Sequence, residues 1–152
     1  MESDMWSANS KTAADVSASG LAAERLRMEV AANNIANAHS TRSIDGGPYR
    51  RQQVIFASEV ERLTAGRSSG EASLGGVRVV EVAADESPMP QVHQPGHPDA
   101  DENGMVTMPN VQLPHEMVDL VTASRAYEAN LKAMQTYRQM TEQTLSLLQQ
   151  LR

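Results

Sequence analysis

The sequence contains no cysteine and very few aromatic residues. Its 152 residues include one Trp, three Tyr and one Phe, so only 3% of the chain is aromatic. The absence of cysteine excludes a disulfide framework and a thiolate metal site. Large rings bury the most apolar area per residue, so their scarcity argues against the compact core of a typical enzyme. The nine Met and many Ala residues instead indicate contacts between helices.

The sequence also lacks an excess of positive charge, a long apolar run and a recognisable leader. Thirteen Lys and Arg against 19 Asp and Glu give a net charge of −6. This charge disfavours nucleic acid as a partner, because phosphate binding needs a basic face. No window approaches the ~18 apolar residues of a membrane-spanning helix. Residues 1–14 carry Glu2, Asp4 and Lys11 without an apolar segment, so no cleaved signal peptide is expected.

Proline and glycine divide the chain into three parts. All seven Pro and eight of the nine Gly lie between Ser40 and Pro114. We predict an N-terminal arm and helix in 1–38, a middle segment of loops and short strands in 39–112, and a C-terminal helix in 113–152. The predicted fold class is mainly α. The two helices form an antiparallel coiled-coil pair and one core domain, with a small, irregular, β-containing middle segment.

Both predicted helices carry residues at alternating spacings of four and three, which is the seam of a coiled coil. The first helix covers about 14–38, and its seam comprises Ala14, Ala18, Leu21, Arg25, Met28, Ala32 and Ile35. The second begins at Leu113 or Pro114 and ends at Gln150. Its seam comprises Leu113, Met117, Leu120, Ser124, Tyr127, Leu131, Met134, Arg138, Thr141, Leu145 and Leu148. One helix cannot hide so long a stripe, so assembly with further helices is expected.

The middle segment contains two stretches that favour strands. One covers 53–57, and the other surrounds Val77, Val79 and Val82 after a Gly-Gly turn. Turn residues occur throughout 87–110, so this stretch is predicted as loop. We expect two to four short strands and no independent large core.

Histidine and aspartate in the middle segment offer an alternative function. His93, His97, Asp99 and Asp101 fall within nine residues, and such side chains bind metals. The intervening Pro and Gly residues prevent the helical His pair of zinc proteases, and no Glu between the histidines could act as a base. The stretch DADENG lacks the acidic residue that an EF-hand needs at its last position. A turn-rich loop is therefore preferred over a metal site, and no cofactor or small-molecule substrate is expected.

The first helix ends in an asparagine-rich stretch, ANNIANAHSTR, although Asn is a mediocre helix former. Asn33 and Asn37 are i,i+4 neighbours on one face. A buried Asn beside a coiled-coil seam costs stability but fixes register and partner number. Asn37 would also help the chain to leave the helix. The alternative is an Asn-rich end that frays.

Two further stretches could contact neighbouring subunits. Arg50 and Arg51 follow GGPY and are either solvated loop residues or partners of an acidic neighbour, since a guanidinium pairs well with a carboxylate. SRAYEAN places Tyr127 on the seam with Arg125 and Asn130 on its flanks. It is either an ordinary amphipathic turn or a subunit contact.

These stretches also carry a resemblance to a known family. ANNIANAHSTR followed by GGPYRRQ resembles the N-terminal motif of the bacterial flagellar rod and hook proteins. EMVDLVTASRAYEANLKAMQTYRQM resembles their C-terminal part, and the resemblance runs over about 18–148. GGPYRR and PGHPDADENGMVTMPNV favour one proximal-rod member specifically. The distal-rod and hook proteins are also similar at both ends but carry a much larger middle. Met105 stands where an aromatic is common, and the tail after Met140 is longer than in many relatives.

The resemblance implies a structural subunit and not an enzyme. Such proteins are exported unfolded from the cytoplasm by the flagellar type III apparatus, without a cleaved signal. They build the basal-body rod that crosses the periplasm and transmits motor torque. The implied partners are copies of the chain, other rod proteins, the membrane-ring and export-gate base, and the rod-junction protein. Alternatives are another proximal-rod subunit of the same family, a cytosolic coiled-coil adaptor, and the metal-dependent enzyme considered above.

The residues expected at subunit interfaces come from the two seams and from the motifs that carry the resemblance. They are Leu21, Met28, Asn33, Asn34, Ile35, Asn37, Arg50, Arg51, Met117, Leu120, Arg125, Tyr127, Asn130, Leu131 and Met134.

Overall fold

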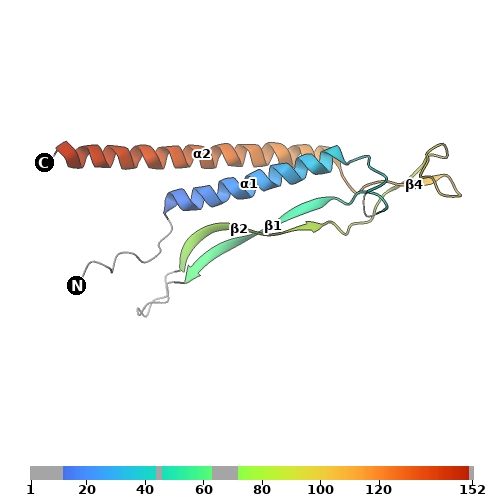
Figure 1. Ribbon diagram of the computed structural model, residues 1–152, viewed down its shortest axis with the longest axis horizontal. Coiled ribbons are helices and arrows are strands. Elements are labelled where there is room, and N and C mark those ends of the chain that lie inside the picture. Colours follow the sequence, from blue (N-terminus) through green and yellow to red (C-terminus); the bar gives the residue numbers. More distant parts are fainter. Residues whose placement is uncertain (1–11, 44–45, 63–71, 151–152) are drawn as a thin grey trace.

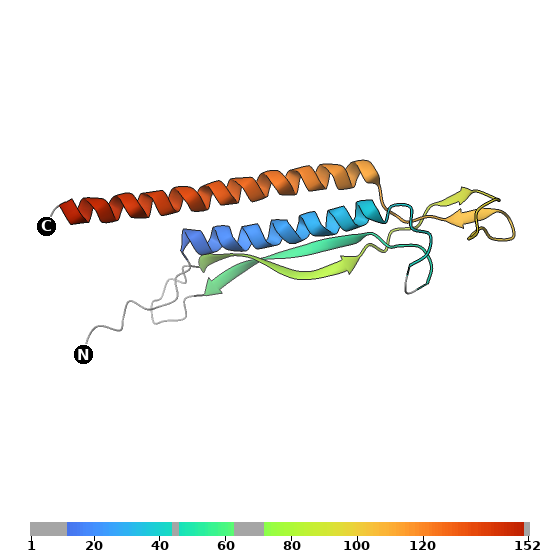
Figure 2. The ribbon, with the colours of Figure 1, turned by 45° about the horizontal axis from the view of Figure 1, so that its top comes forward.

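Two antiparallel helices and a long β-hairpin lie side by side in an elongated arrangement (Figures 1 and 2). The computed structural model describes residues 12–43, 46–62 and 72–150, so the predicted N-terminal arm lies almost entirely outside the described residues. The elements in chain order are α1 (Ala13–Ala36), β1 (Gln52–Arg62), β2 (Ala72–Ala84), β3 (Gln91–His93), β4 (Met105–Thr107) and α2 (Leu113–Gln150). Helix α1 is the middle layer, with α2 on one side and the β1–β2 hairpin on the other.

Helix α1 has a well-defined cap at each end. Thr12 and Asp15 form a capping box: Thr12 Oγ1 accepts from the Asp15 backbone N–H at 3.3 Å, and the Asp15 carboxylate accepts from the Thr12 N–H at 2.8 Å. Asn37 caps the C-terminal end of the helix, and its N–H donates to Asn33 O at 3.1 Å. The predicted helix and its exit at Asn37 are confirmed. Asn37 has φ −100°, so the exit does not use the left-handed conformation.

Helix α2 has the bounds that the sequence predicts, with Pro114 in the first turn, where its missing N–H leaves no helical bond unmade. Its pairing with α1 is fixed by three contacts. Asn130 lies over Gly20, Asp119 Oδ1 accepts from Arg27 Nη2 at 2.7 Å, and Glu116 Oε2 accepts from Asn34 Nδ2 at 2.9 Å. Residues later in α1 contact residues earlier in α2, so the two helices are antiparallel, as predicted.

The three α1 residues in these contacts are seven apart, which is a heptad spacing. This row lies one residue before the predicted seam, so the coiled-coil seam predicted for α1 is not confirmed. Leu21, Met28 and Ile35 are half-buried, and the predicted seam residues Arg25 and Ala32 are exposed. The physical reason is that Gly20 and Ala23 (3% exposed) permit close backbone approach, whereas large apolar side chains at the same place would hold the helices apart.

On α2, only part of the predicted seam faces α1. The more buried residues along this face are Glu116, Leu120, Ala123, Tyr127, Asn130, Met134 and Tyr137. Met117 and Leu131 are 55% and 40% exposed. Residues 138–150 are all exposed, because α2 continues past the start of α1 (Figure 2).

The middle segment is more regular than predicted. Strands β1 and β2 pair antiparallel from Gln52↔Ala84 to Arg62↔Ala72, with a register shift between Ile55 and Phe56. The strand expected at 53–57 is thus 11 residues long. An isolated two-stranded hairpin is only marginally stable, so contact with α1 stabilises this one. The alternation of apolar residues in the sequence did not predict this contact. Strands β3 and β4 pair within the stretch predicted as loop, so that prediction is wrong for these residues.

The buried core is small and rich in alanine. Among the residues that the structure describes, its apolar members are Ala23, Val30, Ala31, Ala38, Val106 and Ala123. Four of these six are Ala, which agrees with close helix contact in place of a large-ring core. None of the described helices is long and apolar enough to cross a membrane.

Gly76 lies where the hairpin passes close to α1, and its replacement is expected to lower the stability of the fold. Its φ is 101°, and a Cβ there would overlap Ser19 Oγ, which accepts from the Val77 N–H at 3.1 Å. Gly76→Ala should therefore lower the free energy of unfolding by about 2–4 kcal/mol in urea titrations. Gly96→Ala is the matched control, because no atom lies within 4 Å of its added Cβ. Equal losses in the two variants would contradict this account of the crossing.

Candidate functional site

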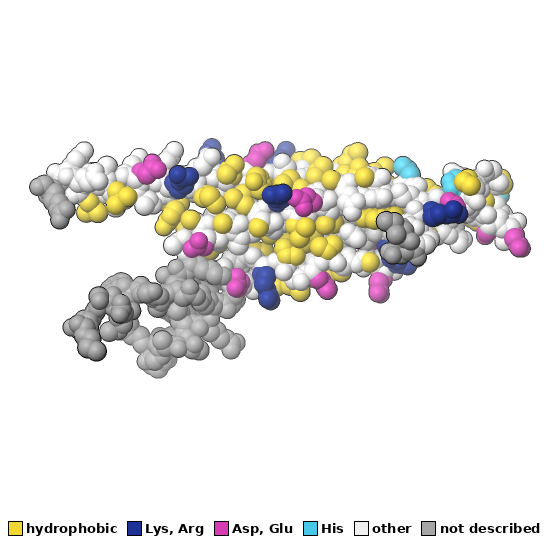
Figure 3. Space-filling model, viewed as in Figure 1, with side chains coloured by type: hydrophobic (Ala, Val, Ile, Leu, Met, Phe, Trp, Pro, Cys, Tyr) yellow, Lys and Arg dark blue, Asp and Glu magenta, His cyan; other side chains and the backbone are white. Residues whose placement is uncertain are grey.

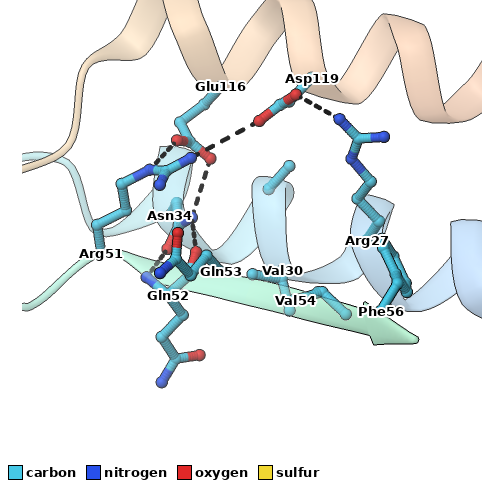
Figure 4. Close-up of a pocket in the computed structure, with 11 residues that line it drawn as sticks. Arg27, Val30, Asn34, Arg51, Gln52, Gln53, Val54, Phe56, Glu116 and Asp119 are labelled. Atoms are coloured by element: carbon cyan, nitrogen blue, oxygen red, sulfur yellow. Dashed lines mark hydrogen bonds and ion pairs between the residues drawn. The ribbon is translucent and has the colours of Figure 1, made fainter. Parts of the chain in front are cut away.

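Asn34 lies on α1 between the first turn of α2 and the start of β1 (Figure 4), and its amide uses all of its hydrogen-bonding capacity. The residue is 1% exposed. Its Oδ1 accepts from Gln52 N at 2.9 Å and from Tyr49 Oη at 2.8 Å. Its Nδ2 donates to Gln52 O at 2.8 Å and to Glu116 Oε2 at 2.9 Å. Both acceptor and both donor positions of the amide are filled. Asn34 thus pairs with the backbone of Gln52 as a neighbouring strand residue would.

Glu116 is the second centre of this cluster, which we call the polar junction: Asn34, Tyr49, Arg51, Gln52 and Glu116. Glu116 is 1% exposed, and a buried carboxylate requires compensating donors. Its Oε1 accepts from Arg51 Nε at 2.6 Å, while its Oε2 accepts from Asn34. Figure 4 shows the Arg51 and Asn34 side chains converging on the carboxylate from the hairpin side and from α1.

The charges of the junction stabilise one another. Burial alone would lower the pKa of Arg51, but the carboxylates of Glu116 and Asp85 outweigh it and raise that pKa. Burial first, and the Glu116 charge second, raise the pKa of Tyr49. The guanidinium therefore stays charged and the phenol stays protonated, which keeps both as hydrogen-bond donors.

Asn110 secures the hairpin end of the junction. It is 8% exposed, and its Oδ1 accepts from Arg51 N at 2.8 Å. Its Nδ2 donates to Asp85 O and Ser87 Oγ, each at 3.0 Å. The segment that leads into α2 is thereby tied to the residues flanking β1 and β2.

Asp85 makes the junction sensitive to acid. The backbone N–H and the hydroxyl of Ser87 lower the pKa of Asp85 most strongly. Burial opposes them, and the hydrogen bond and charge of Arg51 lower this pKa further. Because the folded pKa is depressed, Asp85 stabilises the fold above its unfolded pKa, and this stabilisation is lost as pH falls through the folded value. The difference in unfolding free energy between wild type and Asp85→Asn should shrink below about pH 4. Urea titrations at several pH values measure it, and a difference independent of pH would contradict the role of Asp85.

The structure brings together two of the predicted interface residues, Asn34 and Arg51. Both make their polar contacts within the chain, so Arg51 finds its carboxylates on α2 and after β2. Arg50 is exposed, and its Nη1 donates to Asp85 O at 3.2 Å. Asn33 and Asn37 are side by side as predicted, with Asn37 Nδ2 donating to Asn33 Oδ1 at 2.8 Å.

The other predicted interface residues lie along the two helices and make none of the hydrogen bonds of the junction. Met117, Arg125 and Leu131 are exposed. The half-buried members are Leu21, Met28, Ile35, Leu120, Tyr127, Asn130 and Met134. Their part in contacts between subunits stays a prediction.

Sequence reasoning missed Glu116, Tyr49 and Asn110. Glu116 lies one position before the predicted seam residue Met117. Apolar periodicity identifies apolar residues and therefore does not indicate a buried carboxylate. The available signal was the position of Glu116 in the first turn of a helix, where acidic residues are favoured by the helix dipole. That signal does not identify a partner.

Two residues of the alternative metal site, His97 and Asp99, make hydrogen bonds and an ion pair within the chain. The Asp99 carboxylate accepts from Thr41 Oγ1 at 2.8 Å and pairs with Arg42. His97 Nδ1 accepts from the Asp99 N–H at 3.1 Å. In the part of the chain that the structure describes, no group of three or more His, Asp or Glu residues could hold a metal ion. These side chains instead fasten the β3–β4 tip to the segment that follows α1.

Comparisons with known proteins match both ends of the chain. The family described as "Flagella basal body rod protein" matches residues 15–42. The family described as "Flagellar basal body rod FlgEFG protein C-terminal" matches residues 102–147. Asn34 lies in the first matched segment and Glu116 in the second, so the junction joins the two.

Individual relatives match over most of the chain. The flagellar basal-body rod protein FlgC of Borreliella burgdorferi is 41% identical over 150 residues, covering 89% of this chain and 95% of that protein. FlgC of Salmonella typhimurium is 43% identical over 133 residues, covering 88% and 93%. FlgC of Bacillus subtilis is 40% identical over 141 residues, covering 88% and 94%.

Proposed function

The chain belongs to the FlgC family of flagellar basal-body rod proteins, and from this premise we propose how it builds the rod. It is a structural subunit of the bacterial flagellum and part of the basal body. In our proposal, the apolar surfaces that α2 leaves exposed pack against helices of neighbouring subunits. The seams then complete a coiled-coil arrangement that a single chain cannot complete by itself.

The proposal extends to place and partners. The subunit is exported unfolded by the flagellar type III apparatus, without a cleaved signal, and joins the periplasmic part of the rod. It contacts copies of itself, other rod proteins, the membrane-ring and export-gate base, and the rod-junction protein. Torque is transmitted through many helix contacts, and the chain has no catalytic role.

The exposed apolar stripe of α2 is the observation that carries the proposal. Leu145 and Leu148 are 56% and 61% exposed, although Leu148 lies four heptads after the half-buried Leu120. Figure 3 shows hydrophobic side chains on the free end of α2, beyond α1. Exposed apolar side chains that repeat along one face of a helix are typical of an assembly surface, and a neighbouring helix would bury them.

Leu131 tests the stripe nearer the middle of α2. Leu131→Asp is expected to leave the monomer folded and exported but to prevent rod assembly, because a carboxylate cannot be buried without partners. Secretion assays and microscopy of basal bodies measure the two steps separately. Ala129→Asp adds the same charge at an exposed position two residues earlier, so it should assemble normally. Lost secretion of Leu131→Asp, with normal assembly of the residual protein, would contradict the proposal.

A further inference from the structure

The polar junction joins three elements whose backbones do not all meet. Asn34 belongs to α1, Gln52 is the first residue of β1 with Arg51 directly before it, and Glu116 lies in the first turn of α2. The backbones of α2 and the hairpin lie on opposite sides of α1 and make no close contact along the described elements. Side chains of the junction therefore provide a direct link between the start of the hairpin and α2.

The loss of either the hairpin or α2 breaks contacts made by both remaining elements. If the hairpin moved away, Asn34 would lose Tyr49 and both backbone partners on Gln52. Glu116 would at the same time lose the guanidinium of Arg51. If α2 moved away instead, Asn34 and Arg51 would lose the carboxylate that accepts from both. A buried polar network that is only partly satisfied is less stable than one that is fully made or fully solvated.

We propose that the junction is a conformational latch, which makes the hairpin and the first turns of α2 open and close as one cooperative unit. The states in which only one of them has left α1 are disfavoured, because each leaves buried polar groups without partners. This inference concerns the single chain and does not rest on its proposed place in the rod.

Native-state hydrogen exchange on the full chain tests the latch. In wild type, the backbone amides of 52–56 and of 119–123 should exchange through openings with one common free energy and one urea dependence. Asn34→Ser removes the bridging amide without adding charge. It should accelerate exchange in both segments by at least about tenfold and give them different urea dependences.

A control variant outside the junction and a second variant within it complete the exchange experiment. Arg25→Ala removes an exposed ion pair with Glu29 on α1 and should leave both segments unchanged. Should Asn34→Ser fail to fold, Arg51→Met changes only the hairpin side and should still accelerate exchange in 119–123. The latch is wrong if the two wild-type segments already open independently. It is equally wrong if the folded variant accelerates only the segment that carries its own contacts.

Discussion

Asn34→Asp is expected to lower the free energy of unfolding by about 3–5 kcal/mol. The change replaces the Nδ2 donor, which lies 2.9 Å from Glu116 Oε2, with a second carboxylate oxygen. Two buried carboxylates at this distance repel each other, and Gln52 O loses its donor as well. Urea unfolding at neutral pH measures the loss. Asn33→Asp is the matched control, because the neighbouring Asn33 is exposed and should tolerate the charge.

Adding Glu116→Gln to Asn34→Asp should recover about 2 kcal/mol of this loss. The introduced amide would donate to the introduced carboxylate, so the hydrogen bond returns with its direction reversed. Its oxygen would still accept from Arg51 Nε. A double variant no more stable than Asn34→Asp alone would show that the loss comes from somewhere other than the Asn34–Glu116 contact.

The second large effect is expected at the free end of α2. Leu145→Ser combined with Leu148→Ser should abolish the rod and swimming, yet change the unfolding free energy of the monomer by less than about 0.5 kcal/mol. Both side chains are exposed in the single chain, so the fold does not need them. Assembly does need them if a neighbouring helix buries them. Basal-body microscopy, swimming assays and urea unfolding of the secreted protein measure the three quantities.

Leu147→Ser is the matched control for the free end. Leu147 is 60% exposed but does not share the heptad row that connects Leu120 to Leu148. Normal rods are expected in this variant. The proposed interface would be contradicted if Leu147→Ser were as harmful as the paired change, or if the paired change left swimming intact.

The sequence predicts the helices well because their signals are local. Alternating spacings of four and three, Pro114 in the first turn and Asn37 at the exit place both helices within a few residues of their observed bounds. Which face of α1 contacts α2 depends on residues far away in the sequence. Gly20, Arg27 and Asn34 form its contact row only because Asn130, Asp119 and Glu116 lie opposite them, and apolar periodicity takes no account of such partners.

The hairpin and the junction depend still more on tertiary contacts. Strand β1 extends past the predicted apolar stretch because the paired strand and α1 hold it, not because its own pattern continues. Asn34 and Arg51 were singled out by sequence, but Glu116 lies 82 residues from Asn34. No spacing rule connects residues at that separation, so the partner is visible only in the folded chain.

Deletion of the gene, followed by electron microscopy of purified basal bodies and a swimming assay, tests the central claim most directly. The account predicts non-motile cells in which the membrane ring is present but the rod and hook are missing, with recovery when the wild-type gene is returned. Cells with intact flagella and normal swimming would contradict a structural role in the rod.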